Sequence, residues 1–227
     1  MPILGLKNTE NKDNGKEVFH FPSSKNALII FTRNPELGKC KTRLAATIGN
    51  EAALEIYKFL IVHTVKISTE VIADKFVYYS EERRKNDYWN DATFSKKTQH
   101  GSDLGIRMEN AFNEVFALGY ERAIIIGSDM YDITAAAIDE AFRKLASNNF
   151  VLGPAEDGGY YLLGMKTIQP DIFRNKKWGT ETVQKETLAD LKDESVALLA
   201  EKNDVDYYED IMDIEVFQQF LPNTIKK

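Results

Sequence analysis

Two short, continuously apolar runs constrain the fold more than any other feature of this sequence. ALIIFT (residues 27–32) and RAIIIGSD (residues 122–129) show no alternation of polar and apolar residues, which is typical of strands covered on both faces. Each run ends in polar residues. Ligands of open α/β sheets bind at the carboxyl ends of strands, so the loops after these two runs are the first place to look for a site.

Strand-like and helix-like segments alternate along the rest of the chain. Further strands are expected at residues 75–80, 93–99, 150–154, 160–165 and 195–201. Helices are expected from Asn50 onward, from Leu104 to a stop at Gly119, and at residues 135–147, 180–192 and 209–219. This order predicts an α/β fold with a mostly parallel sheet. We predict one domain over residues 27–227, preceded by a polar arm over residues 1–26 in which VFHF (18–21) could add an edge strand.

Composition narrows the class of protein. A chain of 227 residues with 43% hydrophobic residues suits one globular domain with a substantial core. The net charge of −6 argues against general nucleic-acid binding, which needs a dominant basic face. The single cysteine excludes an intrachain disulfide. No apolar run approaches the length of a membrane span, and without a signal-peptide pattern we expect a cytoplasmic location. The apolar stripes fit either a core or the face of a homodimer.

The loop after the first strand, FTRNPELGKCKTRLA (31–45), concentrates positive charge in an acidic chain. It holds four basic residues and a glycine that shapes it: Arg33, Lys39, Lys41, Arg43 and Gly38. It lacks both the dinucleotide fingerprint and the P-loop pattern. Lysine is nevertheless a compact charge and arginine a bidentate fork for phosphate. The loop therefore predicts a phosphate site, with a solvated cationic loop as the alternative.

Carboxylates follow two of the predicted strands. Asp129 ends the most apolar strand and Asp132 lies three residues on, while Asp204 and Asp206 follow the last strand. A carboxylate at a strand tip is costly unless it is hydrated, paired or bound to metal. Mg²⁺ or Mn²⁺ commonly takes one or two carboxylates together with phosphate oxygens. The alternative is a polar turn followed by a helix cap.

A third candidate is the segment GPAEDGGYYLLG (153–164). Gly158 and Gly159, which follow Asp157, permit positive φ and close approach of a ligand. A plain hairpin turn explains the same residues. Tyr160 suits packing as well as stacking. Three further residues are candidates for ligand contacts: Gln99, Arg107 and Trp178.

Six segments together resemble a known bacterial family. They are FTRNPELGKCKTRLA, QHGSDLGIRMENAF, GSDMYDIT, VLGPAEDGGYYLLGM, WGTETV and DVDYYED, in this order between about Ala27 and Asp213. The combination of KTRLA with GPAEDGGYYLLG is specific. On these motifs the chain is identified as a member of the DUF2064 family of glycosyltransferase-A-like proteins, which is similar to the nucleotide-diphospho-sugar transferases.

The resemblance implies a single three-layer α/β/α domain with a mixed, mostly parallel central sheet. It places Lys41 and Arg43 in a nucleotide-binding loop, and a Mg²⁺ or Mn²⁺ ion on Asp129 and Asp206. The family commonly has cysteine and proline between the two aspartates of GSDxxD, where this chain has Met130 and Tyr131. It also tends to have threonine after DVD, where this chain has tyrosine. These departures bear on loop shape and substrate choice.

The implied activity is that of a metal-dependent transferase acting on a nucleotide sugar, with a glycosyltransferase as the first hypothesis. The runner-up is a nucleotidyltransferase that couples an NTP to a phosphorylated small molecule. A non-catalytic nucleotide-binding protein is the third. The expected partners are a nucleotide sugar or NTP and a small-molecule acceptor. The expected catalytic residues are Asp129, Asp157 and Lys41.

Overall fold

A computed structural model describes residues 6–7 and 19–225 of the chain. Its strands from residue 26 onward are β3 (Asn26–Thr32), β4 (Asp74–Tyr79), β5 (Phe94–Thr98), β6 (Arg122–Gly127), β7 (Phe150–Pro154), β8 (Tyr160–Met165) and β9 (Val196–Leu198). They form one seven-stranded sheet in the order β5-β4-β3-β6-β8-β7-β9. Only β8 runs against the others, pairing antiparallel with β6 and β7. The predicted mixed, mostly parallel sheet is confirmed.

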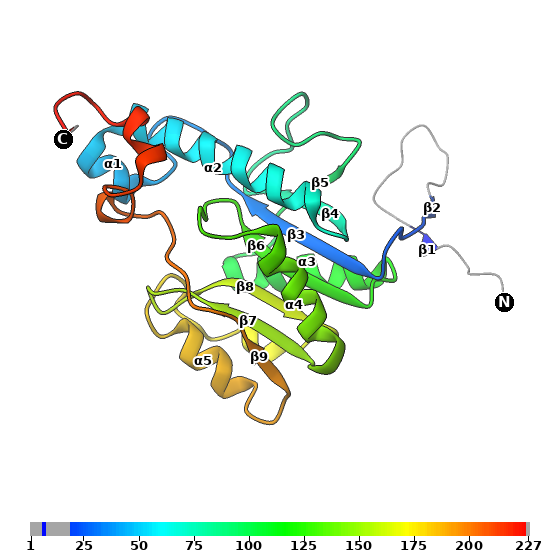
Figure 1. Cartoon of the computed structure of the whole chain (residues 1–227). Helices are drawn as coiled ribbons and strands as arrows, with labels where there is room; N and C mark the ends of the chain where they lie inside the picture. Colours follow the sequence, from blue (N-terminus) through cyan, green and yellow to red (C-terminus); the bar gives the residue numbers. More distant parts are fainter. Residues whose placement is uncertain (1–5, 8–18, 226–227) are drawn as a thin grey trace.

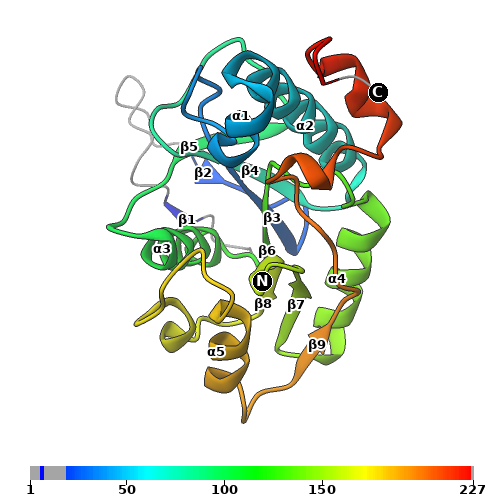
Figure 2. The ribbon, with the colours of Figure 1, turned by 90° about the vertical axis from the view of Figure 1, so that its left-hand side faces the viewer.

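Helices cover both faces of this sheet (Figures 1 and 2). The α-helices are α1 (Thr42–Ile48), α2 (Asn50–Glu70), α3 (Leu104–Ala117), α4 (Ala135–Ser147) and α5 (Val183–Asp190). Three short 3₁₀ helices complete them: η1 (Pro170–Phe173), η2 (Tyr208–Asp210) and η3 (Glu215–Phe220). Helices α2 and α4 lie on one face and α3 and α5 on the other, which gives the predicted three layers.

The two apolar runs are continuous because both of their faces are buried. Successive side chains of a strand point to opposite faces of the sheet. Leu28 and Ile30 of β3 belong to the core under α2 and α4, while Ala27 and Ile29 belong to the core under α3. All four side chains are fully buried. A one-sided sheet would have placed polar residues at every second position.

Several predicted helix boundaries are confirmed by their caps. The Asp103 carboxylate accepts a hydrogen bond from the Ile106 N–H at 3.0 Å and starts α3. The Thr134 hydroxyl likewise accepts from the Ala137 N–H at 3.2 Å and starts α4. Gly119 has φ of 94°, the left-handed conformation that follows a helix end.

The helices differ from the prediction in three places. Helix α1, which was not predicted, begins at Thr42 inside the segment 31–45 that was predicted as a loop. Gly49 at φ 86° separates it from α2, which begins at Asn50 as predicted. Helix α5 is shorter than predicted. The helix predicted at 209–219 is wrong: the segment holds two 3₁₀ turns, because the Asp210 carboxylate accepts the Asp206 N–H at 2.8 Å and bends the chain.

The prediction for the N-terminal arm is only partly testable. Residues 1–5 and 8–18 lie outside the described part, as do 226–227. Strand β2 (Phe19–His20) pairs antiparallel with β1 (Leu6–Lys7) in a separate two-stranded sheet. The strand predicted for VFHF is therefore present at Phe19–His20, but it does not join the seven-stranded sheet. The proposed boundary between the arm and the domain stays a prediction. Within the described residues, no helix combines the length and apolar character needed to cross a bilayer.

The strand order places a binding position between β3 and β6. From β3 the chain adds β4 and β5 on one side, and then crosses over to place β6 on the other. Such a switch point opens a crevice at the carboxyl ends of the strands. The loops that follow β3, β6, β7 and β9 all leave the sheet at this same edge because those four strands are parallel.

Candidate functional site

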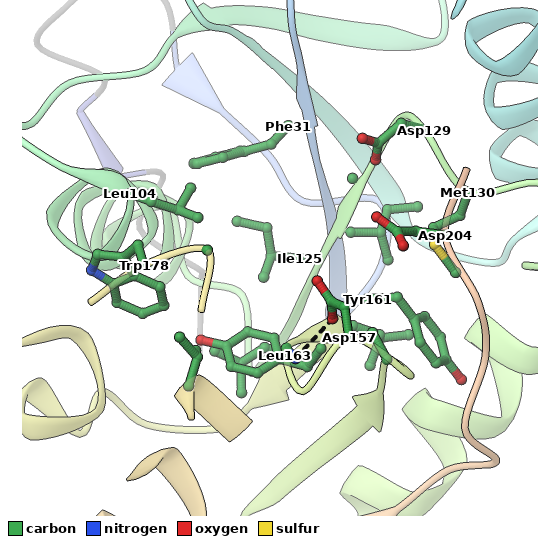
Figure 3. Close-up of a pocket in the computed structure, with 18 of the residues that line it drawn as sticks. Phe31, Leu104, Ile125, Asp129, Met130, Asp157, Tyr161, Leu163, Trp178 and Asp204 are labelled. Carbon is green, nitrogen blue, oxygen red and sulfur yellow. Dashed lines mark hydrogen bonds between the residues drawn. The ribbon is translucent and has the colours of Figure 1, made fainter. Parts of the chain in front are cut away.

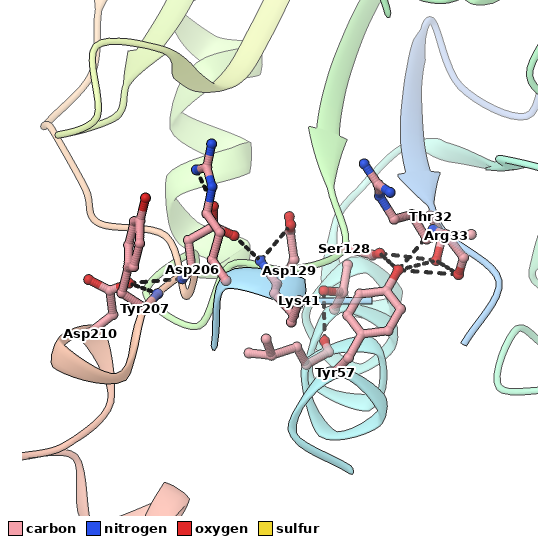
Figure 4. A network of polar contacts seen from close by, with 12 residues as sticks. Thr32, Arg33, Lys41, Tyr57, Ser128, Asp129, Asp206, Tyr207 and Asp210 are labelled. Atoms are coloured by element: carbon pink, nitrogen blue, oxygen red, sulfur yellow. Dashed lines mark hydrogen bonds and ion pairs between the residues drawn. The ribbon is translucent and has the colours of Figure 1, made fainter. Parts of the chain in front are cut away.

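A buried lysine joins two of the predicted aspartates at this edge (Figure 4). The Lys41 Nζ lies 2.9 Å from Asp129 Oδ2 and 3.0 Å from Asp206 Oδ1. These partners are 88 and 165 residues away in sequence. The Lys41 side chain is only 4% exposed. Burial by itself would lower its pKa, but the charges of the two carboxylates outweigh burial and raise it. The ammonium therefore stays charged.

The backbone at Lys41 is strained. Its φ of 48° and ψ of 47° lie in the left-handed region, where a residue with a Cβ costs about 1–2 kcal/mol. Lys41 also precedes α1, and its carbonyl accepts the first helical hydrogen bond, from the Ala45 N–H at 2.8 Å. A glycine would fit this conformation without strain. The chain instead holds a lysine whose ammonium reaches both aspartates.

Arg43 adds a second cation to the contact between the segment after β3 and the segment after β9. Its Nη1 lies 2.8 Å from Asp206 Oδ2, and the guanidinium stacks 5.6 Å from the centroid of the Tyr207 ring. The side chain is 54% exposed, so it faces solvent while it holds Asp206. Asp210 accepts the backbone N–H groups of Asp206 and Tyr207 at 2.8 and 2.6 Å. The segment after β9 is thus fixed against the basic loop.

Asp129 is positioned by the glycine two residues before it. A Cβ at Gly127 would lie 2.7 Å from Asp129 Oδ1, so any larger residue there would move the carboxylate from its present position. Burial raises the pKa of Asp129, but the charge and hydrogen bond of Lys41, together with the charge of Arg33, bring that pKa below its ordinary value. The carboxylate is consequently ionised at neutral pH, as a ligand for a cation must be.

A buried hydroxyl network ties the ends of β3 and β6 together beneath the ion pairs. The Ser128 hydroxyl donates to Thr32 Oγ1 at 3.0 Å and lies 3.1 Å from the Tyr57 hydroxyl. The same Tyr57 hydroxyl accepts the Arg33 N–H at 2.8 Å. Sequence reasoning missed this role of Tyr57. Within the apolar stripe of α2, a tyrosine gives no signal that separates a polar role from packing.

A cavity of about 250 Å³ opens beside the ion pairs (Figure 3). One side carries the carboxylates of Asp129, Asp157 and Asp204, which we call the acidic rim. The opposite side, which we call the apolar wall, consists of Phe31, Leu104, Ile125, Leu163 and Trp178. The rim residues come from the loops after β6, β7 and β9. The wall residues come from the sheet and from the segments that cover the sheet on the side of α3.

The acidic rim concentrates negative charge. Burial, together with the neighbouring charge of Asp206, raises the pKa of Asp204 from 3.8 to about 6. Asp157 is exposed, and its Oδ1 accepts the Gly159 N–H at 2.8 Å within the β7–β8 turn. The rim is therefore suited to cationic ligands, or to groups that donate hydrogen bonds.

Replacing Asp204 by asparagine is expected to stabilise the protein at pH 7 by about 1 kcal/mol, because the rim then loses one unfavourable charge. The folded pKa of about 6 exceeds the ordinary 3.8, so the folded state binds more protons between these values. Stability is therefore lost as pH rises through that window, and the variant should show a flatter dependence there. Urea unfolding at several pH values measures this. Asp193→Asn, at an exposed position, should leave the pH profile unchanged.

The structure brings some of the other predicted site residues to the cavity. Gly159, Tyr160 and Trp178 line it. Gly158 has φ of 84°, and a Cβ there would lie 2.2 Å from the Glu181 carbonyl oxygen, so the turn packs against that segment. Gly38, with φ of 75°, turns the basic loop.

Other predicted residues lie away from the cavity. The Lys39 ammonium pairs with Glu36 at 2.7 Å and faces solvent. Gln99 donates to the Tyr78 carbonyl at 3.0 Å, and Arg107 Nε to the Gly101 carbonyl at 3.2 Å. Two remaining candidates are exposed at the edges of their loops: Arg33 and Asp132.

The donor set suits a divalent cation that is shared with a ligand. No group of three or more metal-ligating side chains occurs among residues 6–7 and 19–225. Asp129 and Asp206 nevertheless converge on one positive charge, the Lys41 ammonium. Mg²⁺ commonly binds through one or two carboxylates and completes its shell with water and phosphate oxygens. These two aspartates are the residues that could hold such an ion.

The fold and the edge site define an α/β protein of the nucleotide-diphospho-sugar transferase type. The sequence model of DUF2064, described as an uncharacterised protein conserved in bacteria, matches residues 64–180. The chain belongs to this family. Among curated proteins, no sequence matches it.

Solved structures agree with this assignment. A protein from Desulfovibrio desulfuricans G20, provisionally named a nucleotide-diphospho-sugar transferase, is 30% identical with a TM-score of 0.75, over 81% of this chain and 83% of that one. The 4-diphosphocytidyl-2C-methyl-D-erythritol synthase of Anaerococcus prevotii is 9% identical with a TM-score of 0.55, over 86% and 96% of the two chains. Rv0371c of Mycobacterium tuberculosis is 12% identical with a TM-score of 0.52, over 82% and 95%. The last two likenesses concern the fold alone.

Proposed function

We propose that the protein is a metal-dependent glycosyltransferase that uses a nucleotide-diphospho-sugar donor. The observation that carries this proposal is the convergence of Lys41 and Arg43 on Asp129 and Asp206 at one sheet edge. Two cations and two carboxylates in contact suit a ligand that brings both phosphate and a divalent cation. The name given to the 30% identical Desulfovibrio protein supports the same class of donor.

The diphosphate of the donor would lie against the basic loop. Lys41 provides a compact charge, and Arg43 an exposed guanidinium that can donate two hydrogen bonds to one phosphate. Mg²⁺ or Mn²⁺, when bound at Asp129 and Asp206, would neutralise charge on the diphosphate as it departs. The side chains of this chain thereby position the donor and stabilise the leaving group, which is how such transfers are accelerated.

The proposed transfer step needs one base, which removes the proton of the acceptor hydroxyl. An acceptor hydroxyl oxygen forms a bond to the anomeric carbon of the donor sugar, and the bond from that carbon to the diphosphate oxygen breaks. The electron pair leaves with the nucleoside diphosphate. Asp157, a carboxylate that lines the cavity opposite the apolar wall, would take the proton of the hydroxyl.

The Arg43→Gln variant tests the phosphate assignment. We expect it to weaken the binding of a nucleoside diphosphate in the presence of Mn²⁺ by about 1–3 kcal/mol, because a charge-assisted hydrogen bond is lost. Isothermal titration calorimetry measures the change, using the nucleoside diphosphate that most raises the melting temperature of the unmodified protein. The matched control is Lys58→Gln on α2, whose ammonium pairs with Glu55 at 2.7 Å.

Two outcomes would contradict the proposal. Equal affinities of the Arg43 variant and the control would remove the basic loop from the phosphate site. Binding of a nucleoside triphosphate, with no binding of any diphosphate or nucleotide sugar, would instead indicate nucleotidyl transfer.

A further inference from the structure

The inside of the cavity is chemically unlike its rim. Among the described residues that line it, none is lysine, arginine or histidine. The cations of the basic loop, Lys41 and Arg43, are not part of the lining. A phosphate or carboxylate group inside the cavity would therefore face the acidic rim without a positive side chain. An anionic group is therefore disfavoured inside the cavity.

Away from the acidic rim, hydroxyl groups inside the cavity would find few partners. The Tyr160 hydroxyl is fully buried on the side of Thr187, away from solvent. The Thr180 hydroxyl already donates to the Lys177 carbonyl at 2.8 Å. The opposite side is the apolar wall, which offers no hydrogen-bonding side chain except the indole N–H of Trp178. Each ring hydroxyl left unpaired there would cost about tenfold in affinity.

The apolar wall is built into the fold. A Cβ at Gly105 of α3 would lie 2.1 Å from the Phe173 carbonyl oxygen and 2.5 Å from the Trp178 ring. Glycine at this position allows the indole to lie directly against the helix. Leu104, the preceding residue, is 43% exposed at the start of α3. The wall thus presents a fixed ring and an accessible leucine to whatever enters.

The size of the cavity indicates a ring. An apolar protein cavity of about 150 Å³ holds benzene. The cavity here measures about 250 Å³, enough for one six-membered ring with a short substituent. A substituent that reaches the acidic rim would end beside Asp157 and Asp129, where the transfer would take place.

We propose that the acceptor is an alcohol carried on a single apolar ring, aromatic or alicyclic, and not a sugar. The ring packs on the apolar wall and its hydroxyl meets the acidic rim. This inference rests on the proposed function, because the ring compound is an acceptor only if the protein is a transferase. The ring preference of the cavity is a property of the wall and can be measured without any nucleotide.

The test compares ligands that share a six-carbon ring. Cyclohexanol and benzyl alcohol are titrated into the full-length protein, with myo-inositol as the hydroxylated counterpart of the same ring. Saturation-transfer NMR reports binding, and tryptophan emission locates it. The chain has two tryptophans, and Trp89 is 2% exposed and packed on Phe94, outside the cavity lining. We expect saturable binding of both alcohols, at least about tenfold tighter than that of inositol.

Three variants make the result specific. Trp178→Phe should keep the NMR signal of cyclohexanol and lose the change in emission. Leu104→Gln should weaken cyclohexanol binding about fivefold, because a polar group enters the wall. The matched control is Leu198→Gln in β9, a leucine that is 49% exposed and does not line the cavity. Its affinity for cyclohexanol should be unchanged.

Inositol binding as tightly as cyclohexanol would overturn the inference, and so would the absence of saturable alcohol binding. Equal loss of affinity in the Leu104 variant and its control would also overturn it. The proposed function fails separately, if no nucleoside diphosphate binds in the presence of Mn²⁺. Alcohol binding without nucleotide binding would therefore retain the ring-binding cavity and reject the transferase.

Discussion

The Asp129→Asn variant is expected to lose about 100-fold in affinity for a nucleoside diphosphate in the presence of Mn²⁺, which corresponds to about 2.7 kcal/mol. Asparagine keeps the shape of the side chain but removes the charge that would hold the divalent cation. The same variant should bind the nucleotide without metal about as well as the unmodified protein. Titration calorimetry with and without Mn²⁺ separates the two effects.

The fold should tolerate this change. In the Asp129 variant, Lys41 still pairs with Asp206 at 3.0 Å, so no buried charge is left without a partner. A loss of about 1 kcal/mol in the free energy of unfolding is expected. The chain offers a matched control in Asp87→Asn, since Asp87 pairs with the buried Lys96 at 2.8 Å and Asp91 pairs with the same ammonium at 2.9 Å. An equal loss of nucleotide affinity in both variants would contradict the metal assignment.

The sequence predicted the fold well because local and global signals agree. The apolar runs of β3 and β6 have no polar positions since helices cover both faces, and that pattern alone indicates a parallel sheet. Asp103 and Thr134 occupy the capping positions from which α3 and α4 were predicted to start. Where no such local signal exists, prediction was poorer. Helix α1 has no side-chain cap, because the strained Lys41 precedes it.

The sequence indicated which loops carry the candidate site residues, but not which of those residues contact one another. Knowing that ligands bind at strand ends directed attention to the loops that hold Lys41, Asp129 and the pair Asp204 and Asp206, and the family resemblance favoured Asp206 within that pair. Their mutual contacts depend on the strand order, which brings residues 165 positions apart within hydrogen-bonding distance. The apolar wall was not predicted as a unit. Leu104 and Trp178 belong to segments that meet only because Gly105 lets the indole approach the helix.

The role of Lys41 is the point at which stability and function are most closely connected. Its ammonium occupies the position between two carboxylates that a divalent cation would also favour. In the absence of ligand, the lysine reduces the repulsion between Asp129 and Asp206. In the proposed function, the same ammonium would interact with phosphate oxygens when a metal and a diphosphate bind. A residue that served both states would account for the backbone strain at this position.

Replacing Lys41 by methionine should therefore increase the stabilisation by Mn²⁺ and decrease the affinity for a nucleoside diphosphate. The variant keeps a side chain of similar length but leaves two carboxylates with only Arg43 beside them. We expect the free energy of unfolding to fall by about 2 kcal/mol, because the remaining carboxylates are partly exposed and hydrated. Added Mn²⁺ without nucleotide should restore stability in this variant more than in the unmodified protein. The affinity for a nucleoside diphosphate should fall by about 1–3 kcal/mol even with Mn²⁺ present.

Differential scanning calorimetry with and without Mn²⁺, together with nucleotide titrations, measures these effects. Lys96→Met is the matched control, because Lys96 is also buried and also pairs with two aspartates, but on β5. It should lose similar stability without gaining a response to Mn²⁺ and without losing nucleotide affinity. If Mn²⁺ stabilises both methionine variants equally, the cation does not bind between Asp129 and Asp206. If nucleotide affinity survives in the Lys41 variant, that lysine is a structural counterion and the phosphates bind elsewhere on the loop.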